Sequence, residues 1–571
     1  MDGVPNFTIY NLPPSPPKWD NIGIFFICFC CIWTTFVFAG MAFCWYNRNN
    51  PILKIRGLPL SFTAILFLHS YWVLAQLVYP IGGTMPVVLA YDIQYFFMGI
   101  WFPLGIALFH ASNSRFLHVA KLQKQFTNDH RVQVRCNGGG SSWICRFRNM
   151  SYSVRIMTFI GLGMIAQVLL TVGMWLACRK YHPTFGIPGT EIRGATLVEQ
   201  MVDLGRGWEW WPSVVWQVIW TWMVAPYLLW RAWDIRDTMG WRAQTIGCCI
   251  SNLHATPMFL IAQYVPAFAP VNMYYPPSQW IHLSVMMFEI FTVFVPVFQV
   301  IKLNIQRRKV AASNERWESS SQITMFGSVQ SSDQERKGST SSRGKSDIMD
   351  NLLNNEMSDH LYTIGALDYV LRENPTPLQN FSALSDFSGE NIAFLTRAAA
   401  WKNTFSGDFR GEKELDAYNA ALQLYTDFIS PRDAEFPLNL SGPELRRLED
   451  IFEAPTRILC GEPVVNTATP FDIEQPELPG SSDGCSSASN SSTTRLRAKY
   501  TGEIPPGFDD LVFDSTCSHI KYLVLTNTWP KFVDDIRNQN RRSSESGRTF
   551  DSNDSDQTLA SRVTTYVRSM F

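Results

Sequence analysis

The distribution of apolar segments divides this chain of 571 residues into two parts. Up to residue 303, seven segments are apolar over about 20 residues, the length that a helix needs to cross the hydrocarbon core of a bilayer. We expect spans at 22–46, 58–79, 87–111, 155–177, 211–233, 245–267 and 278–303. No such segment follows. The sequence therefore predicts an all-α protein, with a seven-helix membrane bundle at 22–303 and a soluble region after it.

The two parts also differ in charge. Up to residue 310 there are 23 Lys and Arg against 11 Asp and Glu, a balance of +12, and the whole chain is at −1, which leaves −13 for the rest. Lys and Arg are retained on the cytoplasmic side of short loops, and they gather in 47–56, 112–154 and just after the last span. We therefore expect a multi-pass protein of the plasma membrane, with an extracellular tail at 1–21 and a cytoplasmic C-terminus.

Ionisable side chains inside the expected spans are candidates for a membrane cavity, because a charge at mid-bilayer is costly and usually faces a bundle interior. Glu289 is the first such candidate, ahead of Asp92 and His69. For Glu289, a role as a buried structural partner is an equally good explanation. Asn6-Phe7-Thr8 forms a glycosylation acceptor triplet in the expected extracellular tail. These features do not identify an external ligand.

The soluble region begins with a polar stretch at 304–357, which we expect to be a flexible linker. Helical spacing starts near 358 and is interrupted at Asn374-Pro375. A second helix is expected to end near Asp386, and a third to begin at Ser388, whose hydroxyl can cap its free amides. The soluble region shows no Gly-rich phosphate loop, zinc-ligand spacing or Ser/His/Asp arrangement, so we expect no catalytic residues, no metal and no cofactor, and no binding to nucleic acid.

Four blocks in the soluble region follow a family pattern in order. They are FSGENIAFL at 387–395 with Trp401-Lys402 after it, LYTDFIS at 424–430, LNLS at 438–441, and the stretch from Phe508 to Phe532. Together they resemble regulator of G-protein signalling (RGS) domains. The resemblance places an all-helical RGS domain at 358–537, with a polar loop inserted around 453–507, and leaves 538–571 as a disordered tail. Within that tail, Ser543 and Ser544 follow two arginines and are phosphorylation candidates.

The resemblance implies an activity. RGS domains accelerate GTP hydrolysis by the α subunit of a heterotrimeric G protein, which carries its own catalytic Arg and Gln. They hold its switch loops in the transition-state arrangement, and so act as activators of a GTPase without being enzymes. The residues that match the family's Gα contacts are Glu390, Asn391, Asn439, Leu523, Asn527, Thr528 and Lys531. Asn527 and Lys531 depart from the usual Asp and Arg, so a bidentate carboxylate-guanidinium pair cannot form.

The joined layout is similar to seven-spanning RGS proteins of plants and filamentous fungi. The similarity implies a receptor-like protein that attenuates G-protein signalling. Its expected partner is a Gα subunit in the GTP-bound or transition-state form, and its expected external ligand is unknown. Two alternatives stay open. The bundle could be a transporter or channel that carries the RGS-like region as a scaffold, or it could be a passive membrane anchor.

Overall fold

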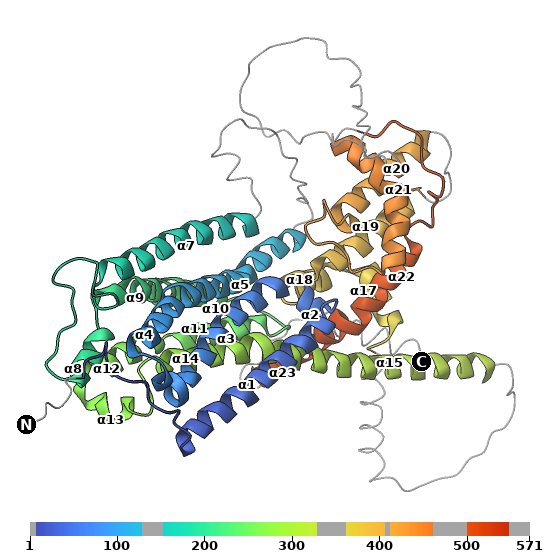
Figure 1. Ribbon diagram of the computed structural model, residues 1–571. Coiled ribbons are helices and arrows are strands. Elements are labelled where there is room, and N and C mark those ends of the chain that lie inside the picture. The colour runs from blue at the N-terminus through green and yellow to red at the C-terminus, as the bar shows by residue number, and fades with distance from the viewer. Residues whose placement is uncertain (1–6, 128–151, 328–360, 406–411, 461–498, 547–571) are drawn as a thin grey trace, which may run out of the picture. The chain divides into compact units, whose positions relative to one another are not determined.

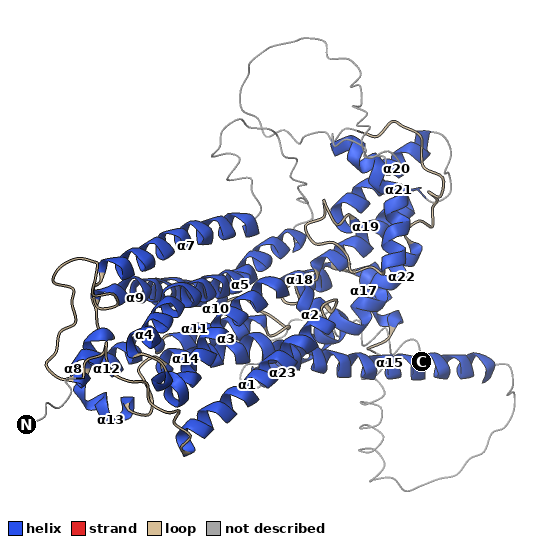
Figure 2. Ribbon diagram, in the orientation of Figure 1, coloured by secondary structure: helices blue, strands red, loops and turns tan. Residues whose placement is uncertain are grey.

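The computed structural model describes residues 7–127, 152–327, 361–405, 412–460 and 499–546. Within these ranges all regular structure is helical, as Figure 2 shows. The chain divides into two compact units (Figure 1). The first consists of Met1–Leu122 with Gly139–Lys302, and the second of Gln123–Gly138 with Leu303–Phe571.

Six helical stretches of the described chain are long and apolar enough to cross a membrane. They are Asn21–Tyr46, Leu58–Thr84, Val87–Thr127, Val154–Ala177, Trp241–Tyr264 and Gln279–Glu315. Their elements are α1 (Asn21–Tyr46), α3 (Leu58–Ile81), η1 (Gly82–Thr84), α4 (Val87–Phe96), η2 (Phe97–Trp101), α5 (Phe102–Gln123), η3 (Lys124–Thr127), α7 (Tyr152–Ala177), α11 (Trp241–Asn252), α12 (Ala255–Tyr264), α14 (Gln279–Glu289), η7 (Ile290–Phe294) and α15 (Val295–Gly327). This agrees with six of the seven spans expected from the sequence.

The remaining expected span, 211–233, is helical but is not among the six. It is built from α9 (Trp211–Val218), η5 (Ile219–Val224) and α10 (Ala225–Trp233). Its six tryptophans, together with Gln217 and Arg231, lower its mean hydropathy. Tryptophan is an amphipathic side chain that membrane proteins place near the interface. A seventh crossing therefore stays a prediction.

Short elements connect these helices. They are α2 (Pro51–Lys54), α8 (Leu197–Leu204), η4 (Trp208–Trp210), η6 (Pro266–Phe268) and α13 (Ala269–Asn272). Helix α8 begins with a capping box, in which Thr196 accepts from the Glu199 amide and the Glu199 side chain accepts from the Thr196 amide. This cap defines where α8 begins in the long segment between α7 and α9.

Widened π-helical turns precede three prolines of the first unit. The turns η2, η5 and η7 end shortly before Pro103, Pro226 and Pro296. Proline lacks an amide hydrogen and its ring clashes with the carbonyl four residues earlier, so the preceding turn opens. These three prolines therefore change the helical hydrogen-bond pattern locally without ending the helical stretches.

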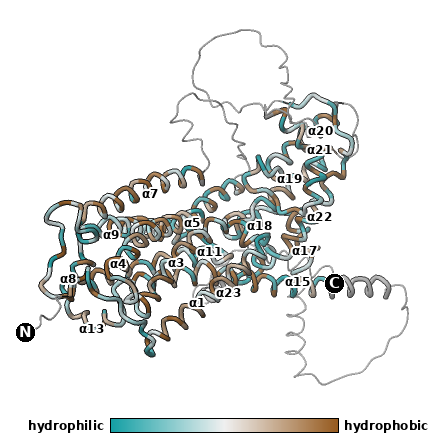
Figure 3. Tube along the Cα trace, in the orientation of Figure 1, coloured by the Kyte–Doolittle hydropathy of each residue, from teal (hydrophilic) through white to brown (hydrophobic). Residues whose placement is uncertain are grey.

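The apolar surface of the first unit is largely exposed on α1 and α7, which appear brown along their length in Figure 3. Phe25, Phe36 and Leu169 are exposed examples. Such a large exposed apolar surface is typical of a membrane-facing helix. Inside the unit, a side-chain carbon at Gly40 would lie 2.6 Å from Cγ1 of Val293, so this glycine allows α1 to approach η7 closely.

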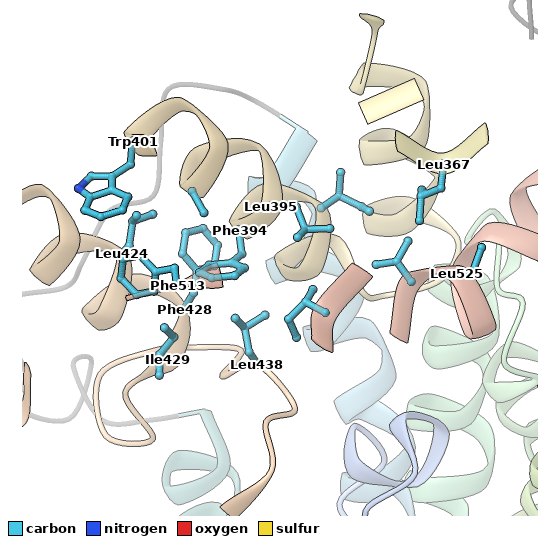
Figure 4. Close-up of a cluster of buried hydrophobic side chains, with 14 of the residues drawn as sticks. Leu367, Phe394, Leu395, Trp401, Leu424, Phe428, Ile429, Leu438, Phe513 and Leu525 are labelled. Atoms are coloured by element: carbon cyan, nitrogen blue, oxygen red, sulfur yellow. The ribbon is translucent and has the colours of Figure 1, made fainter. Parts of the chain in front are cut away.

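Among the described residues, the second unit contains nine further elements. They are α17 (Ile364–Glu373), α18 (Thr376–Leu384), α19 (Gly389–Phe405), α20 (Glu412–Leu424), η8 (Tyr425–Ile429), α21 (Gly442–Cys460), α22 (Asp514–Leu523), η9 (Val524–Thr528) and α23 (Trp529–Ser546). Their apolar faces meet in one core around Phe394, Phe428 and Phe513, which Figure 4 shows. Helix α17 ends where expected, with Asn374 at its C-cap before Pro375.

Two expected boundaries differ from the structure. Helix α15 continues to Gly327, well into the stretch that was expected to be a flexible linker from 304. Val310 is 5% exposed within the core of the second unit, which gives this part of α15 a packing contact. Helix α23 extends to Ser546 and so passes the expected domain end at 537. Most of the expected inserted loop, 461–498, lies outside the described residues.

Candidate functional site

A buried carboxylate joins two distant stretches of the RGS-like region. Asp386 is 1% exposed. Its Oδ2 accepts hydrogen bonds from Ser388 Oγ at 3.0 Å and from Thr528 Oγ1 at 2.7 Å, and its Oδ1 accepts from Lys531 Nζ at 2.7 Å. The start of α19 is thereby tied to η9 and α23. Two of the predicted Gα contacts, Thr528 and Lys531, are brought together by a residue that the sequence analysis used only as a helix end.

The backbone turns sharply just before α19. Phe387 has φ 48°, in the left-handed region, and it is 2% exposed. A bulky residue rarely adopts this conformation. The hydroxyl of Ser388 bonds to Asp386 and Thr528, and the expected capping of α19 by this hydroxyl stays a prediction.

Glu390 and Asn391 occupy the first turn of α19 and are half-buried. The Glu390 carboxylate accepts from Gln123 Nε2 at 2.9 Å. Asn527, in η9, is 7% exposed, and its side-chain oxygen accepts from Arg307 Nε at 2.6 Å. Glu390 and Asn527, two of the predicted Gα contacts, are therefore bonded to Gln123 and Arg307 of the same unit. The sequence analysis did not connect these residues.

Asn439 belongs to a separate set of contacts, in the loop between η8 and α21. The Leu438 amide donates to the Phe428 carbonyl at 2.8 Å, and the Asn439 carbonyl lies 3.1 Å from His519 Nε2 of α22. Asn439 and Leu523 are both half-buried. These hydrogen bonds hold the backbone of the loop in place and so fix the position of the Asn439 Cα atom.

Titratable side chains also lie between the helices around this site. Arg397 of α19 lies 3.1 Å from Asp427 of η8. Burial raises the pKa of the Glu444 carboxyl, but hydrogen bonds from Arg447 and Thr516 outweigh it, so the pKa is below the usual value. Burial raises the pKa of the Cys517 thiol to about 11, so it stays protonated at neutral pH.

In the first unit, two of the three membrane candidates form one pair. His69 Nδ1 lies 2.7 Å from Glu289 Oε1, and both side chains are buried. The other Glu289 oxygen accepts from the Trp33 indole, and His69 Nε2 lies 3.1 Å from the Thr34 hydroxyl. With both carboxylate oxygens engaged, these contacts favour a structural pairing between α1, α3 and α14.

Asp92 lies elsewhere. Its Oδ1 accepts from the Trp175 indole at 2.8 Å, which links α4 to α7. Between α7 and α9, Lys180 Nζ lies 3.5 Å from Asp203 and 3.7 Å from Glu209, and burial raises the pKa of the Glu209 carboxyl. The sequence analysis did not single out this cluster, because its charges balance within one loop.

The remaining candidate positions are only partly described. Asn6 lies outside the described residues, and Ser543 and Ser544 lie in the last turns of α23, where only the backbone is described. Within the described ranges, no group of three His, Cys, Asp or Glu side chains is arranged to hold a metal ion.

Comparisons with models of known protein families, with curated proteins and with solved structures give no match. Function therefore has to be argued from the residues and their contacts.

Proposed function

We propose that the RGS-like region stimulates GTP hydrolysis by a heterotrimeric G-protein α subunit, and that the protein thereby attenuates a signal at the membrane. The observation that carries the proposal is the Asp386 network. It joins the motif at 387–391 to Thr528 and Lys531, residues that share a role only under the RGS resemblance.

The chemistry of these residues suits such a task. The Gα subunit supplies the catalytic Arg and Gln, so its activator needs only to hold the switch loops. Asn439 offers an amide that can donate and accept at once. Buried hydrogen bonds preorganise Thr528 and Lys531, which lowers the conformational entropy lost on binding. Lys531 would act as a single cation, because its ammonium cannot make the bidentate contact of an arginine.

The composition of the first unit supports a membrane location for the proposed activity. Its six apolar helices are compatible with a multi-pass membrane protein. Under the proposal, 211–233 is a seventh span, the basic loops face the cytoplasm, and the RGS-like region meets Gα at the inner face of the plasma membrane. Restriction to the membrane raises the local concentration of activator near a lipid-anchored Gα.

A single-turnover assay tests this function. The full-length protein in lipid nanodiscs is added in large excess to Gα loaded with GTP, and phosphate release is followed. We expect at least a tenfold acceleration over intrinsic hydrolysis. Asn439→Ala should remove most of it, whereas Asn403→Ala, an exposed asparagine at the end of α19, should not. Intrinsic rates with every chain would reject the proposal.

A further inference from the structure

The short segment that follows α5 packs on the RGS-like region, within the second unit. Gln123 and η3 (Lys124–Thr127) belong to this unit together with 303–571. Gln123 is fully buried. We call residues 123–127 the η3 segment. It contacts α18, which precedes the motif at 387–391, and α19, whose first turn contains the end of that motif.

Gln123 satisfies two groups of the motif at once. Its Oε1 accepts from the Gly389 amide at 3.1 Å, and its Nε2 donates to Glu390 Oε2 at 2.9 Å. The Gly389 amide is among the first of α19, which lack partners within the helix. A side-chain carbon at Gly389 would lie 3.0 Å from both Gln123 Oε1 and Phe126 Cβ, so the glycine allows this close approach.

The rest of the η3 segment adds apolar and polar contacts. The Phe126 ring lies 6.5 Å from Phe428 and 6.1 Å from Phe436, measured between ring centroids. Gln125 Nε2 donates to Glu435 Oε2 at 3.0 Å. Glu435 and Phe436 lie in the loop that carries Asn439, and Phe428 lies in η8 just before it.

A second segment of the same unit engages another predicted Gα contact. Arg307, on α15, donates from Nε to Asn527 Oδ1 at 2.6 Å. A guanidinium is thus bonded to the amide that stands where the RGS pattern has a carboxylate. Val310, one turn further along α15, is buried in the core of the unit.

We infer that the η3 segment and Arg307 occupy part of the surface that the proposed function assigns to Gα, so that Gα binds only when they are displaced. This inference rests on the proposed function. The competing groups are covalently attached to the domain, so they act at a high effective concentration. The apparent Gα affinity is then reduced by the fraction of molecules in which the surface is open. Because Gln123 ends α5 and Arg307 lies on α15, a movement of either helix could change that fraction.

Gln123→Glu is the sharpest test, because it keeps the size of the side chain but places a carboxylate against Glu390. The full-length protein in nanodiscs is titrated with Gα bound to GDP and aluminium fluoride, which mimics the transition state. We expect the apparent Kd to fall about five- to tenfold. Gln423→Glu, at an exposed position of α20, is the matched control and should leave it unchanged. Phe126→Ala should act in the same direction as Gln123→Glu.

A second measurement observes the displacement itself. A photo-crosslinking benzoylphenylalanine at position 126 should crosslink to the peptide with Phe428 and Phe436, and the yield should fall when the Gα complex is added. Equal Kd values for all chains, or a crosslink that persists at saturating Gα, would overturn the inference and leave the proposed function standing. If no chain binds the Gα complex, the proposed function fails instead.

Discussion

Lys531 Nζ lies 2.7 Å from Oδ1 of Asp386, a carboxylate whose side chain is 1% exposed. The lysine side chain itself is 14% exposed. The two charges therefore neutralise each other away from most of the solvent, and the hydrogen bonds of Ser388 and Thr528 satisfy the other carboxylate oxygen. Such a pair contributes modestly in net terms, but the loss of one partner is strongly destabilising.

We predict that Asp386→Ala loosens the junction between α19 and α23. Removing one partner of a buried ion pair costs about 3–5 kcal/mol, which corresponds to a loss of protection from hydrogen exchange of about 100-fold or more. The measurement is amide exchange over 389–405 and 529–539 in the full-length protein. Asp416→Ala removes the partner of Lys499 from an exposed pair and should change exchange less than about twofold.

Thr528→Val should separate the effect of the hydroxyl from that of packing. The side chain is 2% exposed, so valine fills its space but leaves Asp386 short of one donor. An unsatisfied buried acceptor costs about 1–3 kcal/mol. Thr528→Ser keeps the donor and should recover most of the exchange protection. A larger loss for Thr528→Ser than for Thr528→Val would mean that the methyl group, not the hydrogen bond, matters.

The stability of the α21–α22 contact should depend on pH through Glu444. Its carboxyl accepts from Thr516 at 2.6 Å and from Arg447 at 2.9 Å, and its pKa is below the usual value of 4.5 for a glutamate. The ionised form is thus favoured in the folded state, so the stabilisation is present above pH 4.5 and is lost as the pH falls through the folded-state pKa. Glu444→Gln should remove this acid dependence, measured as exchange over 514–523 corrected for intrinsic rates.

In the first unit, His69 and Glu289 should be energetically coupled. We predict that His69→Ala and Glu289→Ala together destabilise the protein less than the sum of the single changes, by about 1 kcal/mol or more. The readout is unfolding in mixed detergent micelles. His69→Ala combined with Asp92→Ala should be additive, because Asp92 bonds to Trp175 and not to His69. Additivity of the first pair would argue against a direct interaction.

Local signals in the sequence predicted much of the helical architecture. The stop at Asn374-Pro375 and the apolar lengths of six spans depend on neighbouring residues only, and the structure agrees with both. The extension of α15 was missed because its packing depends on Val310, one apolar side chain in a charged stretch. The membrane pairing of His69 with Glu289 was also beyond prediction, since their separation in sequence carries no signal of contact.

The candidate site shows the same division. Motif residues such as Glu390, Asn439 and Lys531 could be selected from their order along the chain. Asp386 could not be recognised as the residue that links Ser388, Thr528 and Lys531, because its partners are up to 145 positions away. Likewise, the hydrogen bond between Gln123 and Glu390 joins residues 267 positions apart, and it depends on the packing of the η3 segment against α19. Partners at such distances are set by tertiary packing.

The backbone at Phe387 is a point of local frustration next to the candidate site. Glycine would relieve the left-handed conformation but would leave the space of the ring empty, and a large L-residue fills that space only at a cost of about 1–2 kcal/mol. No ordinary substitution meets both demands. Random mutagenesis followed by selection for a folded protein should therefore recover very few replacements of Phe387, although the Phe387 side chain makes none of the hydrogen bonds of the Asp386 network.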